Sequence, residues 1–167
     1  MMVTRSYMDG FEPSLEDIKR HLRITSDDLD ESLKMYLQAA IEAAEHHIGS
    51  VIARSEFVYD GWFVRSFDMK GPGCKLTSVE VDGNILSETD YKVSRNTVLI
   101  SSDVTGCERM TVAYEAGMTQ VPFDIKAAIL LIAAKLFNNP VDSVETLPSF
   151  ARNLLRPYRT WGLRDGE

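Results

Sequence analysis

Cysteine and histidine are scarce in this chain, and their scarcity excludes several classes of protein. Among the 167 residues there are two cysteines, Cys74 and Cys107, and three histidines. Two cysteines are too few for a disulfide-stabilised scaffold or a structural zinc site. Both lie in a segment rich in β-forming residues, and we expect them to be reduced and inert. The few histidines leave little material for acid–base catalysis.

Long apolar runs are missing as well. No segment approaches the ~20 apolar residues that a membrane span needs, because Lys126 precedes the most apolar stretch and Lys135 interrupts it. The first residues, Met1–Gly10, lack the apolar core of a secretory signal. We therefore expect a cytoplasmic chain that has no membrane partner.

Motifs for catalysis and for cofactor or metal binding are also lacking. Gly71–Cys74 is not followed by the Gly-Lys-Ser/Thr of a phosphate loop, and there is no Gly-x-Ser-x-Gly. The acids of segment 27–30 lack the glycine and terminal glutamate of a calcium loop. Glu42 and His46 are four residues apart, so paired polar groups on a solvated helix face explain them better than a di-iron site. We predict no catalytic residue, no metal, no cofactor and no enzymatic activity.

Positive charge is in deficit overall and is unevenly distributed. The net charge of −7 argues against a general nucleic-acid binder. Ser26–Ile48 holds six acidic residues and one lysine, a net charge of −5, whereas Leu147–Trp161 holds three arginines and no acid. Such segments are suited to contacts between copies or with partners. A solvated helix and a solvated tail are an equally weighted alternative.

Helical signals are strong in the first third of the chain. Ser14 followed by acids predicts the capped start of a short helix, and Thr25–Asp28 is expected to end it and to cap the next one. Gly49 is the expected stop of that second helix. Its apolar residues recur with the helical period at Leu29, Leu33, Tyr36, Leu37, Ala40, Ile41, Ala44 and Ile48.

A third helix is predicted to begin at Pro122, which suits a first helical position. Ile125, Ala128, Ile129 and Ile132 mark one face, and further apolar residues fill much of the remaining circumference. A helix that is apolar nearly all round must be buried on several sides. In a chain of this size we expect another subunit to cover the second side.

The middle of the chain changes to short runs of β-forming residues. Asp60-Gly61 and Asp82-Gly83-Asn84 read as turns, and we expect five to seven strands. The sequence therefore predicts one α+β domain over 1–167: a helical core of two N-terminal and two C-terminal helices, interrupted by a β-rich insertion of antiparallel strands. The expected parts are a flexible arm (1–12), a helical segment (13–50), the β insertion (54–116), a second helical segment (121–160) and a tail (161–167).

A family resemblance appears at both ends of the chain. The order VPFDIKAAILLIAAKLFNNP…LPSFARNLLRPYR resembles the C-terminal half of the tailed-bacteriophage head–tail connector (adaptor) family. SLEDIKRHLRITSDDLDESLKMYLQAAIEAAEHHIG is similar to the opening helices of the same family. The likeness covers roughly residues 13 to 160 in the right order, and it rests on core residues and arginines rather than on catalytic signatures.

The resemblance implies a structural virion protein. It would form a homo-oligomeric ring, expected to be dodecameric, that joins the portal of the head to the tail or to its stopper protein. Genomic DNA would pass through the ring without sequence-specific binding. The expected location is the head–tail interface of the virion, and the host cytoplasm during assembly.

Two sets of residues follow as candidate contacts. The ending Leu155-Arg156-Pro157-Tyr158-Arg159 matches the family pattern and is expected to bind the portal, with Trp161 beside it, since Tyr, Trp and Arg are enriched in binding hot spots. A final helix with a frayed polar end is the plainer alternative. The expected inter-subunit residues are Tyr36, Glu42, Lys126, Ile132 and Lys135.

Two other functions remain open at this point. One is a small-molecule enzyme or binding domain with its site in a cleft between sheet and helices. The other is a DNA-binding or packaging-associated assembly factor that uses the arginines Arg152, Arg156 and Arg159.

Overall fold

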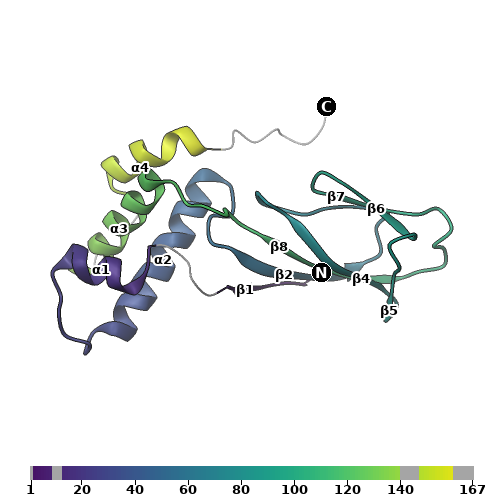
Figure 1. The fold of residues 1–167 in the computed structure, drawn as a ribbon, viewed down its shortest axis with the longest axis horizontal. Helices are drawn as coiled ribbons and strands as arrows, with labels where there is room; N and C mark the ends of the chain where they lie inside the picture. The colour runs from purple at the N-terminus through teal and green to yellow at the C-terminus, as the bar shows by residue number, and fades with distance from the viewer. Residues whose placement is uncertain (1, 9–12, 140–146, 160–167) are drawn as a thin grey trace. The chain divides into compact units, whose positions relative to one another are not determined.

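A computed structural model describes residues 2–8, 13–139 and 147–159, and the contacts of the chain fall into two compact units (Figure 1). The β unit comprises residues 1–9 and 53–119, and the helical unit comprises residues 10–52 and 120–167. The predicted α+β class with antiparallel strands is confirmed. These contacts separate the helices from the strands.

Within its described residues, the helical unit contains four α-helices and one short 3-10 helix. They are α1 (Leu15–Leu22), α2 (Asp30–Ile48), α3 (Phe123–Asn138), α4 (Ser149–Leu155) and η1 (Arg156–Tyr158). α2 packs chiefly on α3, α1 contacts both, and α4 contacts α3 and α2. The largest fully buried side chains of these helices are Ile18, Leu33, Ile48, Ile125, Ile129, Ile132 and Leu155.

The helix ends follow local chemistry, with two corrections. Ser14 and Asp17 form a reciprocal capping box at α1, as the Ser14 signal predicted, and Gly49 adopts a left-handed conformation (φ 72°) after α2. The expected cap of α2 by Thr25–Asp28 is wrong, because Leu29 occupies the N-cap without a side-chain bond and Asp27 pairs with Lys19 instead. Pro122 is the N-cap of α3 rather than its first helical residue.

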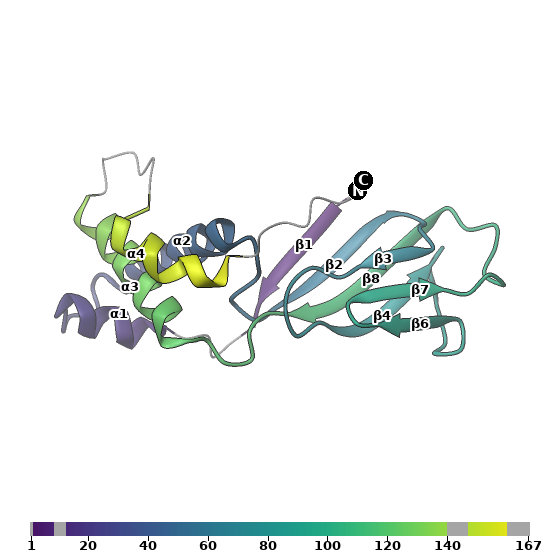
Figure 2. The same ribbon diagram turned by 90° about the horizontal axis from the view of Figure 1, so that it is seen from above.

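The part of the β unit that the structure describes contains two antiparallel sheets. The larger has the order β1-β2-β8-β4-β5 and the smaller the order β3-β7-β6. Figure 2 shows the smaller sheet lying over part of the larger one. The ring of Phe67 in β3 contacts Tyr59 of β2 and Tyr114 of β8, with centroids 4.8 and 6.1 Å away. The strands are β1 (Met2–Tyr7), β2 (Ser55–Trp62), β3 (Ser66–Asp68), β4 (Lys75–Val81), β5 (Asn84–Ile85), β6 (Tyr91–Ser94), β7 (Thr97–Ile100) and β8 (Arg109–Ala116).

The expected flexible arm is corrected by β1. Residues 2–7 pair in antiparallel register with β2, from Met2 opposite Asp60 to Tyr7 opposite Ser55. Arg5 holds the strand in place, because its Nε donates to the hydroxyl of Ser55 at 3.0 Å and its guanidinium lies over the Tyr7 ring. The partner strand is about fifty residues away in sequence, so local periodicity gave no sign of the pairing.

The expected turn at Asp60-Gly61 is also wrong, whereas the turn at Asp82-Gly83 is correct. Asp60 and Gly61 lie inside β2 and pair with Thr111 and Met110 of β8. Glycine is needed there because a Cβ on Gly61 would lie 2.3 Å from the hydroxyl oxygen of Tyr59. Glycine in this strand therefore marks a close approach rather than a reversal of the chain.

Candidate functional site

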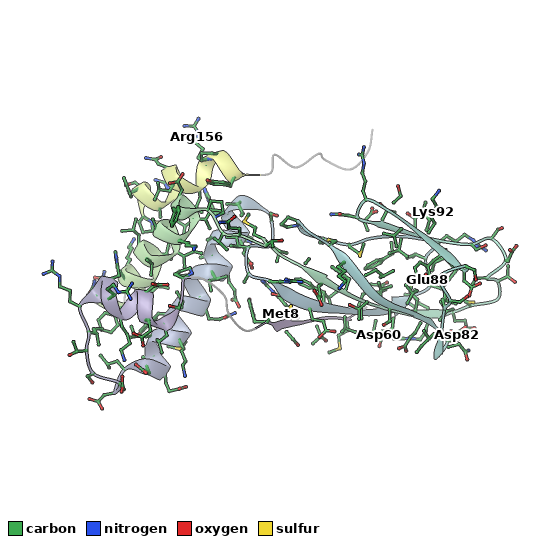
Figure 3. The ribbon with its side chains drawn as sticks, in the orientation of Figure 1. Met8, Asp60, Asp82, Glu88, Lys92 and Arg156 are labelled. Atoms are coloured by element: carbon green, nitrogen blue, oxygen red, sulfur yellow. The ribbon has the colours of Figure 1, made fainter. Side chains whose placement is uncertain are left out.

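The carboxyl-terminal end of the helical unit presents arginines on an exposed surface. Arg152 lies in α4, Arg156 follows the last residue of α4 and begins η1, and Arg159 follows η1; all three are exposed. Figure 3 shows the side chain of Arg156 pointing away from the ribbon. The ring of Phe150 in the first turn of α4 is 63% exposed. We call Arg152, Arg156 and Arg159 the basic surface.

The basic surface lies close to the carboxyl end of α2. Burial lowers the pKa of His47 below its ordinary value, and the charges of Arg159 and Arg152 lower it further. His47 is therefore neutral at pH 7, so the positive charge of the surface comes from its guanidinium groups. Exposed guanidinium groups are suited to an acidic protein partner.

The residues predicted to bind a portal divide into three groups. Arg156 and Arg159 are exposed and Tyr158 is half-buried. Leu155 is fully buried, so its side chain anchors α4 on the helical core and does not reach a partner. Trp161 lies outside the described residues.

A second candidate surface is a groove between α1 and the first turns of α3. Its volume is about 550 Å³. The ring of Phe123 stands at the groove with 86% of its surface exposed, and the ammonium group of Lys126 lies 5.4 Å from the ring centroid. The groove is lined by Pro13, Asp17, Arg20, His21, Phe123, Lys126, Ala127 and Leu130.

The residues predicted at subunit contacts occupy different environments. Glu42 is exposed, and Lys126 and Lys135 are half-buried. The half-buried ring of Tyr36 meets the edge of Phe137 within the chain at 6.2 Å. Ile132 is fully buried in the helical core, so its side chain cannot lie on a surface between subunits.

A smaller hollow in the β unit, of about 260 Å³, carries acidic side chains. Asp60 is paired with Arg109 at 2.6 Å, and the carboxylate of Asp82 accepts the backbone N–H groups of Glu108 and Arg109. These acids therefore have structural partners. Across residues 2–8, 13–139 and 147–159, no group of three or more His, Cys, Asp or Glu side chains is placed to hold a metal ion. None of the helices in those ranges is long and apolar enough to cross a membrane.

The sequence reasoning missed several exposed apolar side chains. Phe123, Phe150 and Met35 are all largely exposed. The signal available for Phe123 was its spacing from Ala127 and Leu130, which repeats the helical period on the side away from the core. For Phe150 and Met35 the sequence carried no comparable indication of exposure, because an isolated apolar residue in a helix is usually interpreted as part of the hydrophobic core.

The expected family resemblance is confirmed over part of the chain. Residues 12–72 match the family model described as phage gp6-like head-tail connector protein. No curated protein matches the sequence.

Solved structures match the fold over the whole chain. A chain from the neck of an empty gene transfer agent (GTA) particle, computed with C6 symmetry, has a TM-score of 0.76 and 19% identity, covering 99% of each chain. A chain from the virion of a native GTA particle has a TM-score of 0.77 and 18% identity, with the same coverage. A chain from a native GTA neck computed with C12 symmetry has a TM-score of 0.69 and 18% identity, again covering 99% of each chain. At these identities, the matches establish a shared fold.

Proposed function

We propose that this chain is a structural subunit of the neck of a tailed phage or phage-like particle. Copies of it would form a ring between the portal of the head and the tail, at the head–tail interface of the virion. The observation that carries the proposal is the similarity of fold to neck chains over 99% of both chains. The match of residues 12–72 to the connector model supports the same role. We assign no enzymatic activity to the chain.

A cyclic ring is the assembly that this role requires. The C6 and C12 symmetries of the similar necks support a ring of twelve copies. A net charge of −7 is compatible with a channel through which DNA slides, because acidic subunits repel phosphate and make few contacts that release counterions.

We assign the portal contact to the basic surface. Its arginines are exposed and close together, and the buried Leu155 fixes the helix that carries them. Guanidinium groups make paired, charge-assisted hydrogen bonds to carboxylates, so the matching portal surface should be acidic. Residues of this type and exposure are the ones that dominate binding energy when they are desolvated at the centre of an interface.

The test is binding of the purified chain to a portal ring from the same virion. We expect the triple variant R152A/R156A/R159A to remain folded and to lose at least ~100-fold in affinity, since each buried charge-assisted contact contributes about 1.5–3 kcal/mol. A matched variant, K70A/K75A/K92A, also removes three exposed positive charges, all from the β unit, and should bind like the wild type. Particles carrying the arginine variant should accumulate as tailless heads under the electron microscope. If the arginine variant binds the portal as well as the wild type does, the portal contact lies on another surface of the chain. A wild-type chain that binds no portal would argue against the neck role.

A further inference from the structure

α3 carries a second apolar stripe on the side opposite its core face. Phe123, Ala127, Leu130 and Ala134 follow one another at intervals of four, three and four residues, which places them on one side of a helix. Phe123 and Ala127 are exposed, and Leu130 and Ala134 are half-buried. We call these four residues the α3 stripe. Its two alanines would allow another helix to approach closely.

The groove beside the α3 stripe has a mainly basic rim. Arg20 and His21 come from α1, and Lys126 comes from α3. The one acid in the lining, Asp17, accepts the backbone N–H of Ser14 at 2.9 Å, a bond that lowers the pKa of its carboxyl group. Asp17 also pairs with Arg20 at 3.6 Å, so Lys126 is the main cation that the rim offers to an occupant. The groove therefore favours an occupant that combines apolar side chains with a carboxylate.

α2 presents such a combination on its own outer side. Met35, Ala39, Glu42 and His46 are spaced by four, three and four residues, the same intervals as in the α3 stripe. All four are exposed, Met35 by 60%. They lie opposite the buried face formed by Leu33, Leu37, Ala40, Ile41 and Ala44. We call them the α2 stripe.

We propose that the α2 stripe of one copy packs in the groove along the α3 stripe of the next copy, a contact that rests on the proposed ring function. The occupant is a second copy of this chain because one sequence supplies two stripes of matching spacing, and Glu42 of the α2 stripe is opposite in charge to Lys126 at the rim of the groove. Equal intervals of four and three residues are the geometry in which the ridges of one helix fit the grooves of another.

The distribution of polar residues selects an antiparallel arrangement of the two helices. In that register Met35 and Ala39 face Ala134 and Leu130, while Glu42 and His46 face Ala127 and Phe123, near Lys126. A parallel register would place the Glu42 carboxylate against Leu130, where its desolvation would be unfavourable. The antiparallel seam thus brings Glu42 beside the basic rim and keeps the apolar residues together.

The seam joins two different surfaces of the chain, so it is heterologous. A heterologous contact forms a ring when its repeated rotation closes, which is the arrangement that the proposed ring function requires. It also covers the second apolar side of α3. Each copy would use its α3 stripe toward one neighbour and its α2 stripe toward the other.

Disulfide trapping between chains tests the seam and its direction. In a background with Cys74 and Cys107 replaced by serine, a chain with Met35→Cys is mixed with a chain of different mass with Ala134→Cys and is oxidised. We expect a mixed disulfide dimer, because these positions face each other in the antiparallel register. The matched control mixes Met35→Cys with Phe123→Cys, which should give no dimer, since residues 123 and 134 are about three helical turns apart. A dimer from the control pair alone would overturn the proposal.

Charge exchange gives an independent readout by sedimentation of the full chain across a concentration series. Glu42→Lys and Lys126→Glu should each weaken self-association about tenfold, and the double variant should recover most of the loss. Glu16→Lys, an exposed change on α1, should have no effect. The seam would be overturned if the wild type forms rings but the Met35→Cys and Ala134→Cys chains give no mixed disulfide, or if the wild type stays monomeric. Portal binding by the wild type, measured separately, decides the neck role itself.

Discussion

At the level of single residues, a buried lysine connects the first helix of the chain to the second. Lys19 is only 6% exposed, and its ammonium group contacts the carboxylates of Asp27 and Asp30. Asp27 belongs to the connection between α1 and α2, and Asp30 begins α2. A buried cation needs such partners, because desolvation disfavours the charged form. Asp27, which the sequence suggested as part of a helix cap, therefore serves with Asp30 to neutralise Lys19.

The Lys19 cluster predicts a pH-dependent stability. Hydrogen bonding and charge from Lys19 hold the pKa of the Asp27 carboxyl below its usual range. The ionised carboxylate therefore stabilises the fold above the ordinary Asp pKa, and the contribution is lost as the pH falls through the lowered value. We expect Asp27→Asn to be less stable than the wild type near pH 6 and the difference to shrink below about pH 4. Urea unfolding followed by circular dichroism at several pH values measures it.

Asp28→Asn is the matched control for that experiment. Asp28 is exposed, and its carboxylate accepts a hydrogen bond from the neighbouring Ser26 hydroxyl. Its substitution should leave stability nearly unchanged at every pH. A stability difference for Asp27→Asn that does not vary with pH would contradict an ionic role for this carboxylate.

At the level of elements, α3 combines a core face with a second apolar face. The sequence showed both faces, and it led to the expectation that Ile132 lies between subunits. In the structure Ile132 is on the core side, with Ile125 and Ile129, and all three are fully buried. The face available to another copy is the α3 stripe. The sequence of an apolar helix indicates how many of its sides are buried. Which side packs inside the chain and which remains for a partner depends on the other helices that pack against it.

Substitution of Ile132 separates these two assignments. We expect Ile132→Ala to lower the free energy of unfolding by about 2–5 kcal/mol through the cavity that it leaves. Ile132→Asp should prevent the helical unit from folding, because it buries an unpaired carboxylate. Asn138→Ala, at the exposed end of α3, should change the value by less than about 0.5 kcal/mol. Chemical denaturation measures these free energies. An Ile132→Asp chain that is folded but monomeric would instead show that Ile132 lies at a contact between subunits.

At the level of the whole molecule, local signals were predictable from the sequence and long-range ones were not. The capping box at Ser14, the stop at Gly49 and the period of α2 depend on neighbouring residues, and all were predicted correctly. The pairing of β1 with β2 and the continuity of β2 through Gly61 depend on strands distant in sequence. The arginines of the basic surface were predicted as contact residues from their residue type. The groove at Phe123 was not predicted, because α1 forms one of its sides and the sequence does not show where α1 packs.

Whole-molecule charge distinguishes the neck role from that of a DNA-binding assembly factor. The basic surface offers three arginines within a chain of net charge −7. Three phosphate contacts would make the logarithm of the binding constant fall with log salt at a slope of about −2.7, too few for firm binding at physiological salt. We therefore expect no measurable binding of duplex DNA by fluorescence anisotropy near 0.15 M salt. R152A/R156A/R159A should not change this result, although it should abolish portal binding. Duplex binding that is tight at this salt concentration and lost in the triple variant would instead favour the assembly factor, since it would show that the arginines engage phosphate despite the surrounding acids.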